Sequence, residues 1–275
     1  MRTFGVLAGV ACFLALPPVS AVAAVPPPTV FVQDDEEEEV PDEREEVEEL
    51  LDELKPLLKD RKGVNDPDAI GLIDQLLGEF PVSGPKDKKS IVEGVGDCLS
   101  VRRSELDDGS PNQALQRAAA VALGRMGPES QKVLVDHIDH KALRDADAAH
   151  ADVLRSVGRV QAPKGVKKLM DMLECGNYGI EAAAAQGLGM YLGLDSDDRK
   201  EIFEKLLKTI MPLQQVIEQG DTTGNTYDEV RARYDTIGAS IRESMSSLSG
   251  HEERDFNAWR QWWNDNRRRD WVSES

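Results

Sequence analysis

Cysteine is scarce in this sequence, and the paired cysteines that mark redox and zinc motifs are absent. The 275 residues include three cysteines and no Cys-x-x-Cys. Because thioredoxin-like sites and zinc knuckles use such pairs, the sequence suggests neither class. Cys12 falls in an N-terminal apolar run, which leaves Cys98 and Cys175. An oxidising compartment would permit a bridge between these two, and two separate buried thiols are the alternative.

Long apolar runs are also missing, apart from one near the start. Residues 6–16 are apolar, but they fall short of the roughly 20 residues that span a bilayer. They follow Arg2 and precede the small residues Ala21-Val22-Ala23. This arrangement predicts a secretory signal peptide over residues 1–23, with a buried N-terminal helix as the alternative. We therefore expect an exported protein, periplasmic, secreted or in the cell envelope, which is not transmembrane after signal cleavage.

Positive charge is sparse, and the formal net charge is -18. Residues 34–53 hold fourteen acids against the single base Arg44, so most of the excess is local. The one basic cluster is at residues 267–269. Since phosphate contacts need clustered Lys and Arg, we expect no nucleic-acid partner. The stretch over residues 24–40 begins Pro-rich and ends acidic, which predicts a disordered linker.

Motifs of the common catalytic sites are absent. There is no Gly-x-Ser-x-Gly and no Gly-rich phosphate loop after a strand, so we expect neither catalytic residues nor a cofactor. His137, His140 and His150 are weak candidates for metal ligands, because two lie three residues apart and the third is on the next helical segment. A metal site needs three or four converging ligands, and their Asp-His-Lys context is typical of exposed side chains. We expect no bound metal.

What the sequence does contain, from residue 41 onward, is apolar residues spaced three and four apart, the period of amphipathic helices. One helix should begin with Asp66 as N-cap and Pro67 at the first helical position. Residues 110–113 (Ser-Pro-Asn-Gln) read as a capping box that opens a further helix. Gly127-Pro128 should end that helix and start its partner, which gives a helical hairpin. The pattern predicts an all-α fold.

One sequence motif recurs. It is an apolar residue followed by glycine, near the end of a predicted helix that is often Ala-rich. A breaker and a second amphipathic helix follow each copy. Glycine inside a helix costs roughly 1 kcal/mol, so its recurrence predicts close packing between neighbouring helices. A single hairpin cannot bury its apolar face, so the units should stack; an irregular bundle with chance alanines is the alternative. The aligned glycines are Gly78, Gly124, Gly158 and Gly189.

The unit AAxALGxxGxxxxxxxLxxxL resembles the HEAT-type repeats of the armadillo-like α-solenoid superfamily. The resemblance extends over residues 67–248 and is closest over 112–210. It implies a right-handed α-solenoid of stacked antiparallel hairpins, which we place at residues 41–250. The Asp and Arg ladder of some HEAT families is not evident in this sequence.

The C-terminal segment, residues 251–275, carries three of the four Trp in one short predicted helix. Phe256, Trp259 and Trp263 lie at i, i+3 and i+7, which is one helix face, and Trp262 lies beside them. This ending resembles the last unit of exported bacterial HEAT-repeat proteins. The resemblance implies a cap that closes the open end of the array. An aromatic platform for a sugar or a peptide is the alternative.

These observations favour a non-enzymatic exported scaffold or protein–protein interaction module, whose expected partner is another protein. Helical repeats offer an extended surface, and their recurring residues are used in packing rather than in catalysis. The alternative is an exported enzyme, or a small-ligand or metal binder that uses the solenoid surface. A third hypothesis is a cell-envelope structural protein whose acidic N-terminal arm binds cations.

Overall fold

The computed structural model describes residues 41–220 and 225–271. Within these ranges the chain is all-helical, with eleven α-helices, three short 3-10 helices and no strand. None of these helices is both long enough and apolar enough to cross a bilayer. The predicted signal peptide (1–23) and acidic linker (24–40) lie outside the described residues.

Short connections join most successive helices, and the longest one, residues 100–113, precedes α4. In chain order, the α-helices are α1 (Glu45–Leu57), α2 (Asp66–Glu79), α3 (Pro85–Leu99), α4 (Ala114–Arg125), α5 (Gln131–His137), α6 (Asp147–Arg159), α7 (Gly165–Met172), α8 (Tyr178–Leu188), α9 (Ser196–Gln219), α10 (Asn225–Ser249) and α11 (Phe256–Asn266). The 3-10 helices are η1 (Phe80–Val82), η2 (Gly127–Ser130) and η3 (Lys141–Leu143).

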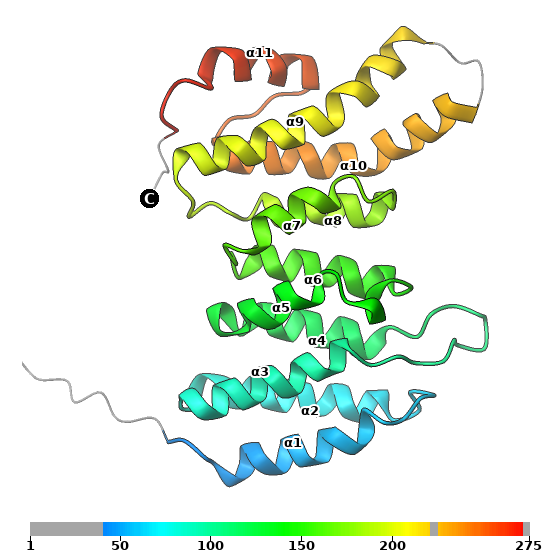
Figure 1. The fold of residues 1–275 in the computed structure, drawn as a ribbon, viewed down its shortest axis with the longest axis vertical. Helices are drawn as coiled ribbons and strands as arrows, with labels where there is room; N and C mark the ends of the chain where they lie inside the picture. Colours follow the sequence, from blue (N-terminus) through cyan, green and yellow to red (C-terminus); the bar gives the residue numbers. More distant parts are fainter. Residues whose placement is uncertain (1–40, 221–224, 272–275) are drawn as a thin grey trace, which may run out of the picture. The chain divides into compact units, whose positions relative to one another are not determined.

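Even-numbered helices pack against other even-numbered helices, and odd-numbered helices pack against other odd-numbered ones (Figure 1). The even-numbered helices form a continuous series in which α2 contacts α4, α4 contacts α6, α6 contacts α8 and α8 contacts α10. Among the odd-numbered helices, α3 contacts both α1 and α5, and α9 contacts both α7 and α11. The even series carries the most extensive contacts between successive hairpins, so the core follows it along the fold.

Three of the four aligned glycines mark the closest approaches in the even series. A Cβ on Gly124 would lie 2.6 Å from the Oγ of Ser156, on α6. A Cβ on Gly158 would lie 2.5 Å from the Cα of Gly187, on α8. Gly189, at the end of α8, approaches α10 equally closely. A Cβ on Gly189 would lie 2.8 Å from the Cα of Ser244, on α10. A side chain at any of these glycines would push two helices apart.

The serines opposite two of these glycines also make equivalent hydrogen bonds to the neighbouring helix. The Ser156 hydroxyl donates to the carbonyl of Ala120 at 2.7 Å. The Ser244 hydroxyl donates to the carbonyl of Ala185, also at 2.7 Å. In both pairs the acceptor lies four residues before the aligned glycine, so the two interfaces share one register.

Gly78 does not fit the predicted pattern. No atom lies within 4 Å of the position that its Cβ would take, and the residue is exposed on α2. The prediction of a packing role is therefore wrong for this glycine. The reason is that α2 meets α4 through its other face, where Ala69, Leu72 and Leu76 are buried.

Two predicted helix starts also differ in the structure. Helix α2 has Asn65 at its N-cap position, and Asp66 is already helical. Helix α4 begins at Ala114, so residues 110–113 form no capping box. In both cases the polar side chains are used over longer distances instead: Gln113 accepts a hydrogen bond from the backbone of Ala149 at 3.0 Å, and Asp66 accepts hydrogen bonds from Arg103.

Candidate interaction site

A groove of about 750 Å³ lies between α7 and α9. Helix α7 has 8 residues and α9 has 24, so the short helix lies along only part of the long one. The groove is lined by Pro163, Val166, Lys167, Met170, Asp171, Leu194, Asp198, Glu201, Ile202, Glu204, Lys205 and Lys208. Its volume falls in the range of about 300–1,000 Å³ that is typical of binding pockets.

The start of α7 is anchored by tight packing. Gly165 is buried, and a Cβ there would lie 2.9 Å from the Tyr191 hydroxyl. The same hydroxyl donates to the carbonyl of Ala162 at 2.8 Å, and burial raises the pKa of Tyr191. These contacts hold the turn before α7 against α6 and the end of α8, which fixes one wall of the groove.

The groove has apolar residues on both of its walls. On α7, Val166 and Met170 are half-buried and lie one helical turn apart. On the α9 side, Ile202 is fully buried beneath the groove and Leu194 is half-buried. The half-buried side chains offer apolar surface that a ligand could remove from water, at about 25 cal/mol per Å².

The rim of the groove carries an excess of negative charge. Lys205 and Lys208 are neutralised by ion pairs, at 2.6 Å to Glu174 and 3.0 Å to Glu204. The hydrogen bond from Lys205 holds the pKa of Glu174 below its ordinary value. Four other charged residues line the rim: Lys167, Asp171, Asp198 and Glu201. None of them makes an ion pair within the described part of the chain.

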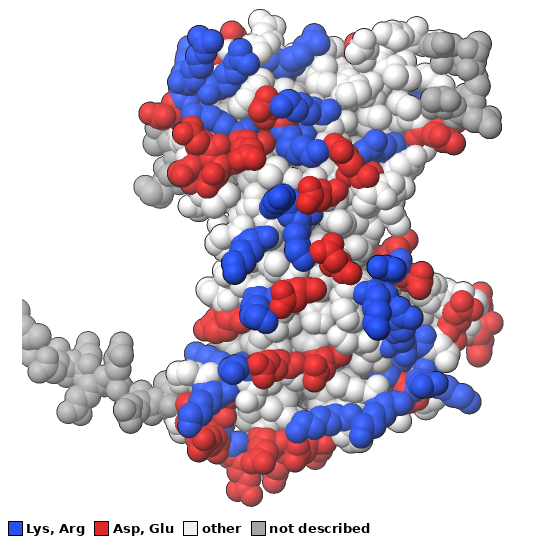
Figure 2. Space-filling model, viewed as in Figure 1, with Lys and Arg blue, Asp and Glu red and all other residues white. Residues whose placement is uncertain are grey.

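Charges of both signs also alternate over the face that carries the odd-numbered helices (Figure 2). Two ion pairs join successive odd-numbered units in the same way. Lys168 on α7 lies 2.6 Å from Asp139, after α5, in the same way that Lys205 on α9 meets Glu174, after α7. Lys205 at the groove thus has the same kind of partner that Lys168 has one hairpin earlier.

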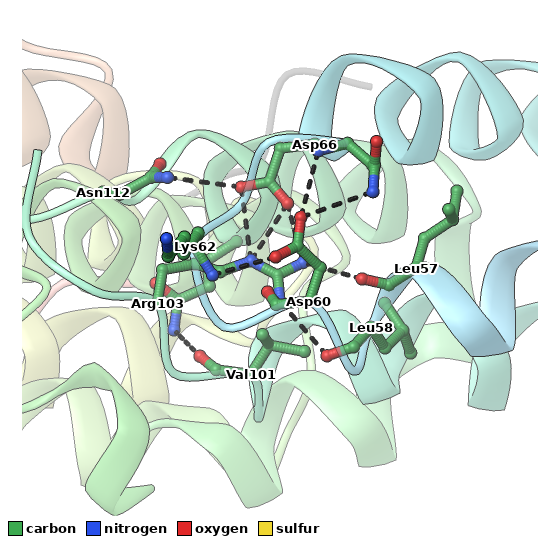
Figure 3. Close-up of polar contacts among 10 residues, drawn as sticks. Leu57, Leu58, Asp60, Lys62, Asp66, Val101, Arg103 and Asn112 are labelled. Atoms are coloured by element: carbon green, nitrogen blue, oxygen red, sulfur yellow. Dashed lines mark hydrogen bonds and ion pairs between the residues drawn. The ribbon is translucent and has the colours of Figure 1, made fainter.

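A buried ion pair joins the first two helices to the connection before α4 (Figure 3). The side chains of Arg103 and Asp66 are 2% and 5% exposed, and Arg103 Nη2 lies 2.6 Å from Asp66 Oδ1. Arg103 also donates to the carbonyls of Leu57 and Leu58 at the C-terminus of α1, and to that of Asp60. The guanidinium thus caps one helix and neutralises a carboxylate on the next.

Two further arginines cap helix ends in the same manner. Arg233 donates to the carbonyl of Leu173 at the end of α7 at 3.0 Å, and to the buried carboxylate of Glu181 at 2.7 Å. Arg199 donates to the carbonyl of Leu248 in α10 at 3.2 Å, and to that of Trp271 at 2.6 Å. Cations at helix C-termini interact favourably with the helix dipole. No periodic pattern in the sequence marks any of these arginines.

A polar ladder crosses the even-numbered helices, although no such ladder is evident in the sequence. We define it as Arg117 of α4, Asp152 and Arg155 of α6, Gln186 of α8 and Ser240 of α10. Asp152 accepts from Arg117 at 2.8 Å and from Arg155 at 2.9 Å. Arg155 also donates to Gln186 at 2.6 Å, which in turn donates to the Ser240 hydroxyl at 3.0 Å. The ladder therefore links four successive helices of the series.

Replacing Asp152 with alanine is expected to lower the free energy of unfolding by about 1 kcal/mol, because partly exposed ion pairs contribute little more than that. Urea denaturation followed by circular dichroism measures the change. Asp136→Ala is the matched control, because Asp136 pairs only with Lys132 on its own helix. If the effects of Asp152→Ala and Arg117→Ala simply add in the double variant, the two side chains are not coupled and the ladder is not a network.

The three histidines proposed as weak metal ligands are only partly brought together. The rings of His137 and His140 lie 5.0 Å apart. Both ring nitrogens of His137 have partners, the Ser100 hydroxyl at 3.0 Å and the carbonyl of Val133 at 2.7 Å. Burial lowers the pKa of His150. Across residues 41–220 and 225–271, no group of three His, Cys, Asp or Glu side chains is arranged to hold a metal ion.

The two cysteines of the described residues are both free thiols, so they form no bridge, but only one of them is buried as the alternative expected. Cys98 is buried in α3, and burial raises its pKa to about 12. Cys175 is exposed after α7, and partial burial of its sulfur raises its pKa as well.

A thiol reagent is therefore expected to label one cysteine in the native chain prepared without residues 1–23, which removes Cys12, and two in denaturant. The reason is that only Cys175 is accessible, while Cys98 stays buried and protonated. Mass spectrometry of the labelled chain gives the count. The Cys175→Ser variant should take up no label while folded, and rapid native labelling of that variant would contradict the placement of Cys98.

The aromatic residues of the predicted cap pack inward. Phe256, Trp259 and Trp263 are buried on α11, and Trp262 is half-buried. The ring of Phe203, on α9, lies 5.1 Å from that of Trp263 and 5.6 Å from those of Trp259 and Trp262. Trp271 completes the cluster at 5.3 Å from Phe203. The rings therefore join α11 to α9, and little aromatic surface is left for a sugar to stack on.

Comparison with known proteins identifies no relative of this chain. No protein-family model, curated protein or solved structure matches the chain at a significant level. The interpretation of its function therefore depends on its own residues and their geometry.

Proposed function

We propose that the chain is a non-enzymatic, exported scaffold of HEAT-like repeats that binds another protein in the groove between α7 and α9. The observation that carries the proposal is the groove itself, with apolar surface on both walls and an acidic rim. Such a surface suits a polypeptide that presents apolar side chains flanked by charged ones. Residues 1–23 supply the argument for export, since they have the pattern of a signal peptide.

The repeated contacts support the HEAT-like part of the proposal. Gly124, Gly158 and Gly189 meet a small residue of the next even-numbered helix in one shared register. A right-handed α-solenoid of stacked hairpins requires such a repetition, because each unit buries its apolar face only against its neighbours. In this interpretation α11 and the aromatic cluster close the C-terminal end of the array.

Site-specific photo-cross-linking in the organism that exports the chain tests the proposal. A photoreactive phenylalanine analogue at position 170 lies in the groove, and the same analogue at the exposed Val82 is the matched control. We expect position 170 to cross-link one defined protein that position 82 does not capture. Equal products at both positions, or none at position 170, would contradict a partner-binding groove.

A further inference from the structure

We infer that the α7/α9 groove receives a short amphipathic helix whose apolar stripe is flanked by Lys or Arg. The inference rests on the proposed function, because it names the class of segment that the same groove binds. Three observations carry it: the dimensions of the groove, the placement of its apolar residues and the balance of charge on its rim.

The dimensions suit one helix of about two to three turns. Helix α7 has 8 residues, which corresponds to a wall about 12 Å long. Val166 and Met170 lie four residues apart on this wall and face the groove, opposite Leu194 and Ile202. Helices that bind in grooves place apolar anchors at i, i+3 or i+4, and i+7, which matches a wall with two anchor positions one turn apart.

The charge of the rim favours basic residues on both sides of the apolar stripe of that helix. Asp171 lies on the α7 wall, and Asp198 and Glu201 lie on the α9 wall. None of the three makes an ion pair with a described residue, and only Lys167 opposes them. A helix between the walls therefore meets carboxylates on both flanks. Basic flanks would be attracted, and acidic flanks would place like charges together.

The same charge balance argues against an acidic peptide or an anionic lipid surface as the occupant. Both would bring negative charge to a rim that is already in acidic excess. The lysines that could compensate, Lys205 and Lys208, are held by Glu174 and Glu204.

Two synthetic peptides of equal length test the inference, with the mature chain as receptor. Each carries Leu at i, i+4, i+7 and i+11, one with Lys and Arg flanks and the other with Glu flanks. Fluorescence anisotropy at low and moderate salt measures both affinities. We expect the basic peptide to bind about ten-fold more tightly than the acidic one, and to weaken as salt screens the rim.

Variants assign the preference to the groove. The double charge reversal Asp171→Lys with Glu201→Lys should weaken the basic peptide about ten-fold and favour the acidic one. Met170→Glu should weaken both peptides, because it places a charge among the apolar residues. Glu93→Lys is the matched control, since Glu93 is exposed on α3, outside the groove, and should change neither affinity.

Equal affinities for the two peptides, no binding by either, or a preference that survives the double reversal would overturn the inference. Its failure can be told apart from that of the proposed function by mapping the cross-linked segment of the partner. A defined partner whose cross-linked segment is acidic or extended leaves the proposed function standing and refutes the amphipathic basic helix.

Discussion

Replacing Arg103 with alanine is expected to lower the free energy of unfolding by about 3–5 kcal/mol. The substitution leaves the buried carboxylate of Asp66 without its partner, and it removes the donors to the carbonyls of Leu57 and Leu58. An uncompensated charge at 5% exposure carries a large desolvation penalty, and the uncapped end of α1 adds to it. Urea denaturation followed by circular dichroism at 222 nm measures the loss.

Arg102 provides the matched control for this prediction. It is the adjacent arginine, but it is exposed and donates only to the carbonyl of Lys141. Arg102→Ala should change the free energy of unfolding by at most about 0.5 kcal/mol. The double variant Arg103→Met with Asp66→Leu should recover much of the loss, because no buried charge then remains. Similar losses in Arg103→Ala and Arg102→Ala would show that the buried pair does not stabilise the fold.

The sequence anticipates those parts of the fold that arise from local periodicity. The spacing of apolar residues predicts the helices, and the aligned glycines predict close helix pairs at Gly124, Gly158 and Gly189. The same reasoning fails at Gly78, because a glycine after a leucine signals a permissive position without saying which face meets a neighbour. A helical period identifies the buried stripe of a helix but not its partner.

The buried polar contacts could not be predicted, because their members are far apart in the chain. Arg103 and Asp66 are 37 positions apart, and Arg233 and Glu181 are 52 positions apart. Each residue alone reads as an ordinary surface charge, since arginine and carboxylates are rarely buried without a partner. Asp66 shows the consequence: its sequence context predicts an N-cap, yet it is the first helical residue of α2 and its carboxylate accepts hydrogen bonds from the distant Arg103.

The groove between α7 and α9 could not be predicted from the sequence, for a different reason. Leu169, Met170 and Leu173 all belong to the apolar pattern of their helix, but Leu169 and Leu173 are fully buried while Met170 is half-buried. The difference depends on how much of α9 extends beside the short α7, which no local pattern encodes. Nor does the sequence distinguish Lys205 and Lys208, whose charges are neutralised, from the carboxylates of Asp171 and Glu201.

A pair of glycine substitutions with effects of opposite sign tests the stacking of the even-numbered helices. Gly158→Ala should lower the free energy of unfolding by about 1–3 kcal/mol or more, because the new methyl group would overlap the backbone of Gly187 and force α6 away from α8. Backbone cannot move aside as a flexible side chain can. Gly78→Ala should instead raise the free energy of unfolding by about 0.5–1 kcal/mol, since its Cβ enters open space and alanine favours the helix.

Both variants make the same chemical change at the penultimate residue of a helix, so helix propensity alone would stabilise both by a similar amount. The difference between them therefore isolates the cost of the contact between α6 and α8. Urea midpoints and slopes for the two variants give this difference directly. If Gly158→Ala were as stable as Gly78→Ala, the two helices would not be in contact at these glycines. The register shared by Gly124, Gly158 and Gly189 would then lose its physical basis, and with it the repeated interface on which the scaffold proposal depends.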